Sequence, residues 1–215
     1  MQDILFERMC NDQEIKLLIE NSYNQQCESL NFKIIPESIA HFIRDKFALR
    51  DSKFSEFMSD KTELSKNEIK GAIIFFGKGQ CSSCHNGPHF SDFNFYRILY
   101  PQLGFGKNGF GIDYGRFNNT LDPDDMYAFR TPPLANVGLT KPYGHSGSVK
   151  TLKDAIIGHF DPFALVDFEN LDGIRRRELY SATISISDTQ PLPAYLDEQE
   201  LDDLISFLET LTFNQ

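Results

Sequence analysis

The sequence is short of basic residues and long apolar runs, and it has no tryptophan. Its 215 residues carry 21 Lys and Arg against 31 Asp and Glu, a net charge of −10, which argues against a phosphate-binding surface and hence against nucleic acid as a partner. The longest apolar runs, such as residues 72–76, are far too short to cross a bilayer. The N-terminus lacks the basic start and apolar stretch of a secretion signal, so we expect either a cytoplasmic protein or a processed or truncated chain.

The apolar and aromatic content is sufficient for a packed core. Hydrophobic residues make up 40% of the chain and include 20 Phe and 8 Tyr, which argues against intrinsic disorder. The length suits one full-sized domain or two small ones.

Helical spacing dominates the first seventy residues. Asp12 is a predicted N-cap, Pro36 suits a first helical turn, and Ser65 with Glu68 matches a capping box before a helix that ends at Gly77. The apolar positions of these three helices, which we expect in the core, are Ile15, Leu18 and Ile19; Ile39, Phe42, Ile43 and Phe47; and Ile69, Ala72, Ile73 and Phe76.

The centre of the chain, residues 86–135, follows neither a helical nor an alternating period. Many of its residues are Gly, Pro, Phe and Tyr, which predicts long ordered loops of the kind that carry function. Helical spacing returns after the N-cap Thr151, with the apolar set Leu152, Ala155 and Ile156 next to His159. A final helix starts near Asp197, with Leu201, Leu204, Ile205, Leu208 and Leu211 on its buried face. The predicted fold class is mostly α, with a loop-rich centre.

One motif carries clear chemistry. Cys81-Ser82-Ser83-Cys84-His85 is C-x-x-C-H, the attachment signature of a c-type haem. Two thiols three positions apart on a helical turn can reach the two vinyl groups of one porphyrin. The adjacent His85 can then bind the iron as the proximal ligand.

Other uses of these cysteines are weaker. A zinc site needs about four nitrogen or sulfur ligands, and Cys10 and Cys27 do not form a second close pair. A thioredoxin-type dithiol calls for a βαβ context that the sequence lacks, and a disulfide leaves His85 unexplained. Covalent haem is attached outside the cytoplasm, where Cys10 and Cys27 could form a disulfide; free buried thiols are the alternative.

The ordered blocks around this motif resemble the C-terminal half of the bacterial di-haem cytochrome c peroxidases and their MauG-like relatives. The blocks cover residues 75–88, 113–116, 129–137, 139–147 and 151–162. The resemblance implies a periplasmic, cytochrome c-like haem domain over residues 65–215, with a helical segment, residues 1–64, packing on it. It also implies one covalent haem c in this chain.

The resemblance also implies roles for other residues. His159 occupies the position of the second axial ligand of the C-terminal haem, although a core histidine bonded to backbone is the alternative. His145 matches a loop histidine that could act as a distal acid–base group, an outer hydrogen-bond donor or an alternative ligand. Arg116 and Arg130 match arginines that could pair with propionates or form surface salt bridges. The Thr140 and Pro142 carbonyls fall where the family binds calcium.

The sequence departs from the family by having one haem motif instead of two and no tryptophan between haems. It therefore matches either part of a longer di-haem protein or a short mono-haem relative. We expect an oxidoreductase that reduces hydrogen peroxide, or uses it to oxidise a donor cytochrome, a cupredoxin or a protein or peptide substrate. The alternatives are a non-catalytic electron-transfer cytochrome or electron-accepting subunit, and an enzyme that matures a partner peptide or protein. Dimerisation follows only by analogy.

Overall fold

The computed structural model describes residues 2–46, 48–102, 112–186 and 195–213. It divides into two compact units, Met1–Leu49 and Arg50–Gln215. The fold is mostly α, as predicted, and the described residues form a single sheet of two short strands. The domain boundary expected between residues 64 and 65 stays a prediction. Among the described residues, no helix combines the length and apolar character needed to cross a membrane.

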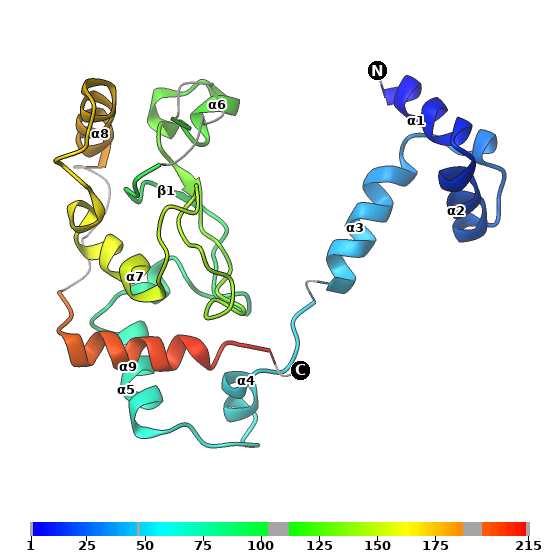
Figure 1. Cartoon of the computed structure of the whole chain (residues 1–215). Helices are drawn as coiled ribbons and strands as arrows, with labels where there is room; N and C mark the ends of the chain where they lie inside the picture. The colour runs from blue at the N-terminus through cyan, green and yellow to red at the C-terminus, as the bar shows by residue number, and fades with distance from the viewer. Residues whose placement is uncertain (1, 47, 103–111, 187–194, 214–215) are drawn as a thin grey trace. The chain divides into compact units, whose positions relative to one another are not determined.

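The first unit is a set of helices closed by a disulfide (Figure 1). It contains α1 (Gln2–Asn11), α2 (Gln13–Tyr23), the short 3-10 helix η1 (Cys27–Ser29) and α3 (Ile34–Lys46). The Asp12 side chain accepts hydrogen bonds from the first turn of α2, which confirms the predicted cap. The Cys10–Cys27 disulfide joins α1 to η1. A small core surrounds it, formed by Phe6, Ile19, Cys27 and Ile34.

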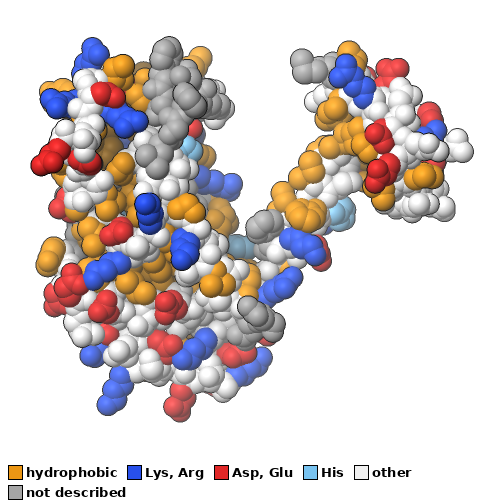
Figure 2. All heavy atoms as spheres, in the orientation of Figure 1, with side chains coloured by type: hydrophobic (Ala, Val, Ile, Leu, Met, Phe, Trp, Pro, Cys, Tyr) orange, Lys and Arg blue, Asp and Glu red, His pale blue; other side chains and the backbone are white. Residues whose placement is uncertain are grey.

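The predicted apolar stripe of α3 does not lie in this core. Ile39, Phe42 and Ile43 are 53, 58 and 50% exposed, and hydrophobic side chains are visible along α3 in Figure 2. Leu18 of α2, also expected in the core, is 63% exposed. Phe47, the last member of the stripe, lies outside the described residues. The first unit is too small to cover both faces of its helices, so helical spacing alone misassigned these positions.

The second unit contains the predicted haem motif and most of the helices and strands of the chain (Figure 1). In chain order these are α4 (Lys53–Met58), α5 (Lys66–Phe76), η2 (Cys81–Ser83), β1 (Phe95–Tyr96), α6 (Phe117–Thr120), η3 (Pro123–Asp125), β2 (Phe129–Arg130), α7 (Leu152–Phe160), η4 (Pro162–Leu165), α8 (Gly173–Ile186) and α9 (Glu198–Glu209).

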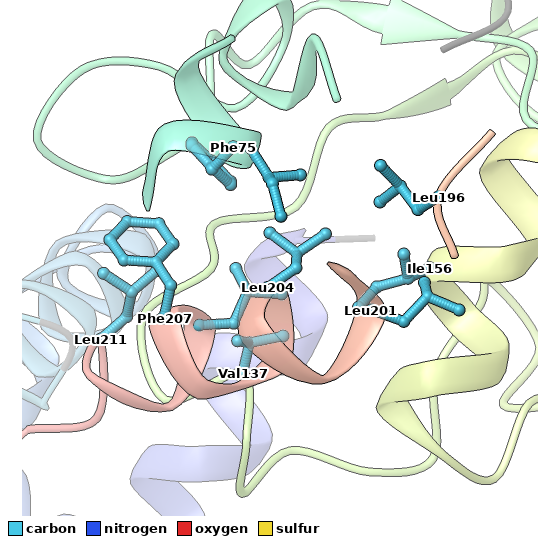
Figure 3. Close-up of a cluster of buried hydrophobic side chains, with 10 residues drawn as sticks. Phe75, Val137, Ile156, Leu196, Leu201, Leu204, Phe207 and Leu211 are labelled. Atoms are coloured by element: carbon cyan, nitrogen blue, oxygen red, sulfur yellow. The ribbon is translucent and has the colours of Figure 1, made fainter. Parts of the chain in front are cut away.

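The main core lies where α9 crosses α5 (Figure 3). The α9 positions predicted from spacing are confirmed, since Leu201, Leu204, Leu208 and the following Leu211 are at most 5% exposed; Ile205 is partly buried. The α5 face is different from the predicted one. Gly71, Ile74 and Phe75 are buried, whereas Ile69, Ile73 and Phe76 are 42, 66 and 53% exposed and Ala72 is partly buried.

Gly71 explains the face that α5 buries. A Cβ atom at this position would lie 2.0 Å from the Asp203 carbonyl oxygen and 2.7 Å from the Phe207 Cβ. Only glycine allows the backbones of α5 and α9 to approach so closely. The close approach turns Ile74 and Phe75 inward. Because α5 has apolar residues on both faces, helical spacing alone could predict either face to be buried.

The loop-rich centre contains short elements instead of long ones. Strand β1 pairs antiparallel with β2, with Phe95 opposite Arg130 and Tyr96 opposite Phe129. Four of the glycines that make this segment loop-like, in residues 103–111, lie outside the described residues. Downstream, Thr151 caps α7 and α9 starts after Asp197, both as predicted; the structure adds a capping box formed by Asp197 and Glu200. Helix α8 was not predicted, because its apolar residues do not gather on one face.

Candidate haem site

The predicted attachment motif forms one helical turn just after α5. Gly77 follows α5 as predicted, and the chain then turns into η2, in which the backbone N–H groups of Cys84 and His85 donate to the Cys81 carbonyl at 3.3 and 2.9 Å. Both cysteines carry free thiols. The structure therefore brings the two sulfurs and His85 onto the single turn that the spacing predicts.

Burial raises the pKa values of the two thiols. It raises the pKa of Cys81 to about 11 and also raises the pKa of Cys84. Redox-active C-x-x-C pairs have the opposite property, a thiol pKa that is lowered by positive charge or a helix N-terminus. The environment of Cys81 and Cys84 thus disfavours a thioredoxin-like role.

His85 is held by the backbone of the loop that follows it. Its Nδ1 lies 3.0 Å from the Phe90 carbonyl oxygen. A carbonyl only accepts hydrogen bonds, so Nδ1 carries the proton and Nε2 is the unprotonated nitrogen. Burial lowers the pKa of His85 to about 4, against the opposing effect of this hydrogen bond. At neutral pH His85 is therefore the neutral imidazole that metal ions bind.

His159 is held in the same way on α7. Its Nδ1 lies 2.8 Å from the Ala155 carbonyl oxygen, one turn earlier in the helix, and 2.9 Å from the Tyr100 hydroxyl. The carbonyl again fixes the proton on Nδ1 and leaves Nε2 unprotonated. Burial lowers the pKa of His159 and keeps the ring neutral.

The rings of the two histidines lie close together although the residues are far apart in the sequence. Their ring centres lie 6.4 Å apart with 62° between the ring planes. Two imidazoles that bind one metal ion end-on at about 2.0 Å have ring centres roughly 6–6.5 Å apart. Metal-bound histidines also donate their other ring N–H to a carbonyl or carboxylate, as both do here. With the free thiols of Cys81 and Cys84 beside His85, the residues present fit a covalent haem c.

His145 forms a separate pair. Its Nε2 lies 3.0 Å from Asp113 Oδ2, and its ring stacks on Phe129 with centres 4.0 Å apart. Asp113 is itself oriented by hydrogen bonds from the Gly115 N–H and the Asn118 amide. Within the described part of the chain, the recorded contacts of His145 are with Asp113 and Phe129 and not with His85 or His159. Its predicted role as a catalytic group stays a prediction.

The two predicted propionate partners lie beside the small sheet. Arg116 forms a 2.9 Å ion pair with Asp125, and its guanidinium lies over the Phe95 ring. Arg130, on β2, lies over the Phe93 ring and donates from Nε to the Phe93 carbonyl at 3.4 Å. Both arginines thus have protein partners, and their pairing with propionates stays a prediction.

The predicted calcium position is a turn of the chain. Thr140 donates from Oγ1 to the Val137 carbonyl at 3.4 Å, and the Lys141–Pro142 peptide bond is cis. Across the described ranges, three or more His, Cys, Asp or Glu side chains nowhere gather in a group that could hold a metal ion. Calcium at the Thr140 and Pro142 carbonyls stays a prediction.

Sequence reasoning missed two residues of the site. Tyr100, which contacts His159, lies in the irregular centre, and Asp113 was noted only as part of a sequence block. One signal was available for Tyr100. Gly158 interrupts the apolar spacing of α7 next to His159, and a glycine inside a helix indicates that another group approaches closely.

Curated proteins similar to this chain are haem peroxidases and MauG. The cytochrome c551 peroxidase of Pseudomonas aeruginosa is 36% identical over 160 residues, covering 67% of this chain and 45% of that protein. The methylamine utilization protein MauG of Methylorubrum extorquens is 25% identical over 210 residues, covering 97% and 52%. The chain thus spans about half the length of these relatives. No protein-family model matches it.

Solved structures similar to this chain are also a MauG-like protein and a diheme peroxidase. A MauG-like protein associated with microbial copper homeostasis is 28% identical, with a TM-score of 0.68 over 97% of this chain and 61% of that one. The diheme peroxidase BthA of Burkholderia thailandensis has a TM-score of 0.71 over 99% of this chain and 59% of its own, at 19% identity, which bears on the fold alone.

Proposed function

Because the chain belongs to the bacterial di-haem cytochrome c peroxidase and MauG-like family, we propose that it is a haem c oxidoreductase that reduces hydrogen peroxide or uses it to oxidise a donor or a protein substrate. The observation that carries the proposal is the pairing of the C-x-x-C-H turn with His159. Two neutral imidazoles from distant segments lie 6.4 Å apart next to two free thiols.

Each of the two cysteines and two histidines has a defined role in this proposal. Cys81 and Cys84 would hold the haem through thioether bonds, and Nε2 of His85 and of His159 would bind its iron. The Phe90 and Ala155 carbonyls hold the two Nδ1 protons, which fixes the tautomers and makes both rings stronger ligands. A bound haem supplies reversible one-electron chemistry and, when one axial position is open, a site for peroxide.

The Asp113–His145 pair supplies acid–base chemistry when His159 does not bind. Asp113 accepts the Nε2 proton of His145, which leaves Nδ1 as the nitrogen that takes up or releases a proton. Stacking on Phe129 keeps the ring in one plane. In this arrangement His145 is the candidate catalytic residue, and Asp113 positions it.

The paired histidines also favour a second function, that of an electron-transfer domain. Two imidazole ligands would saturate the iron, lower its reduction potential relative to His/Met ligation and disfavour direct peroxide binding. The haem of this chain would then supply electron storage, and peroxide chemistry would need a second haem or release of a ligand.

Partners and compartment follow from the family and from the disulfide. We infer hydrogen peroxide as a substrate, and a donor cytochrome, a cupredoxin or a protein or peptide substrate as the partner. The Cys10–Cys27 disulfide and covalent haem both support the periplasm, because disulfides persist in oxidising compartments. The acidic charge of the chain suits a basic donor.

The test is the ferric absorption spectrum of the protein made with a c-type maturation system. A low-spin spectrum that becomes high-spin in His159→Ala supports ligation by both histidines and the electron-transfer function. A high-spin spectrum in the unaltered protein, with rapid reaction with peroxide that His145→Ala slows, supports a peroxidase in its own right.

Two results contradict the proposal. Absence of covalent haem in a strain that matures other c-type cytochromes would overturn the haem assignment. Covalent haem that neither reacts with peroxide nor exchanges electrons with a donor would overturn the oxidoreductase function. His89→Ala is a matched control, since His89 belongs neither to the His85–His159 pair nor to the Asp113–His145 pair; its ring contacts Phe93.

A further inference from the structure

We propose that Tyr100 is a positioning residue that holds His159 on the haem iron and sets how readily the sixth coordination position opens. The inference deepens the proposed function and rests on His159 as a ligand. Neither the C-x-x-C-H motif nor the family resemblance assigns a role to Tyr100. The structure places the Tyr100 hydroxyl beside Nδ1 of His159, the ring nitrogen that is not proposed to bind the iron.

The hydrogen bonds around Tyr100 can be satisfied in only one way. The tyrosine hydroxyl has one proton, which it donates to the Ala155 carbonyl at 2.5 Å. Its oxygen is then the acceptor in the 2.9 Å contact with His159 Nδ1, which also donates to Ala155 at 2.8 Å. The His159 N–H is thus shared between the Tyr100 hydroxyl and the Ala155 carbonyl, and these two oxygens are hydrogen-bonded to each other. This arrangement fixes both the tautomer and the rotation of the His159 ring.

A glycine in α7 leaves room for the Tyr100 ring to pack directly against the helix. Gly158 precedes His159 on α7, and a Cβ there would lie 2.4 Å from Tyr100 Cε1 and 2.8 Å from Leu165 Cδ1. Glycine is a poor helix former, so local helix stability does not explain its presence. Any larger residue would push the Tyr100 ring away from α7 and take the hydroxyl out of reach of His159.

A loop packs near the base of the same side chain. Gly144 has φ +78°, and a Cβ there would lie 3.5 Å from Tyr100 Cγ, an ordinary packing distance. Ser146 donates from Oγ to the carbonyl of Pro101, next to Tyr100, at 3.4 Å. The loop that carries His145 therefore packs on the residue that holds His159. Displacement of the loop would loosen the ring of the proposed ligand.

The function of this contact is to slow the release of His159. A sixth ligand must leave before an external molecule can bind the iron, and its leaving requires the imidazole to rotate away. Partners of this kind typically change metal affinity or activity about 10- to 100-fold when they are removed. We therefore expect Tyr100 to keep the iron closed to peroxide.

The experiment measures the rate at which cyanide binds the ferric holoprotein. Tyr100→Phe keeps the ring beside Gly158 and removes only the hydroxyl, and we expect cyanide to bind about tenfold faster. Gly158→Ala should have the same effect by displacing the ring. Tyr127→Phe is the matched control, because this buried tyrosine donates its hydroxyl proton to Glu178 at 2.8 Å and lies on a different segment from the loop that packs on Tyr100.

The outcomes separate this inference from the function on which it rests. If His159→Ala leaves the ferric spectrum unchanged, His159 is not a ligand and the proposed ligation fails first. If His159→Ala gives high-spin iron but Tyr100→Phe binds cyanide at the unaltered rate, the role of Tyr100 is wrong. Equal acceleration in Tyr127→Phe would show general loosening and would also overturn it. Thermal unfolding of each holoprotein verifies that the variants are folded.

Discussion

The unit of residues 1–49 and the unit of residues 50–215 bury apolar side chains on different scales. The first encloses four buried hydrophobic residues around a disulfide. The second has a continuous core of ten, built mainly on α5 and α9. The first also leaves the apolar stripe of α3 largely exposed, whereas α9 buries its stripe almost completely.

The difference follows from size. A unit of about 50 residues buries too small a share of its surface to be stable without help, and disulfides or partners commonly supply it. The larger unit can rely on packing and can therefore carry irregular loops around the two histidines. Stability of the first unit should depend on one covalent bond, and stability of the second on close packing.

The largest expected effect is in the packed core. Phe207 is completely buried and contacts Phe54 and Phe75. Phe207→Ala should lower the unfolding free energy of the second unit by about 4 kcal/mol, because it leaves a cavity between α5 and α9. Urea unfolding checks this, with Phe168→Ala, 53% exposed, as the control. Equal effects of the two substitutions would contradict a core centred on α9.

The next effect is in the first unit. Replacing Cys10 and Cys27 together by Ser should cost about 3 kcal/mol, as expected for a bridge between residues 17 apart. Amide hydrogen exchange should then show lost protection in α1 and α2 and unchanged protection in α5 and α9. If α1 and α2 stay protected, packing alone stabilises the first unit and the contrast with the second disappears.

The smallest effect is at a helix cap of the second unit. Partial burial works to raise the pKa of Glu68, but hydrogen bonds from Lys53 and the Ser65 N–H outweigh it and lower the pKa below the usual 4.5. Glu68→Ala should cost about 1 kcal/mol at pH 7, as for other helix caps.

The pH dependence of this cost has a definite sign. A lowered pKa in the folded state stabilises the protein above pH 4.5, and the contribution is lost as pH falls through the lowered value. The difference between Glu68→Ala and the unaltered protein should therefore vanish in acid. Chemical unfolding at several pH values measures it, with the exposed Glu63→Ala as control. A difference that is constant with pH would mean that the carboxylate charge does not contribute.

Local signals in the sequence predicted local structure well. The predicted caps at Asp12, Ser65 and Thr151 are all present, because a cap depends on residues within one turn. The Cys81–His85 turn is predicted for the same reason. The stripe of α9 was also assigned correctly, since its apolar residues lie on one face only.

Features that depend on distant contacts were not predictable in this way. The buried face of α5 is decided by Gly71 against Asp203, a contact between residues far apart in the sequence. The Tyr100–His159 and Asp113–His145 pairs likewise join segments that no local pattern connects. Spacing along one segment identifies candidate ligands such as His159, but the groups that orient them come from elsewhere in the fold.

The packing of Cys81 has a consequence for cofactor attachment. This thiol packs against the core that α9 completes, and burial raises its pKa to about 11. The thiolate is the reactive form of cysteine, so a chain in which α9 is undocked should present a more reactive Cys81 than the fully folded chain does. Haem attachment is therefore expected to be easier before this helix packs than after.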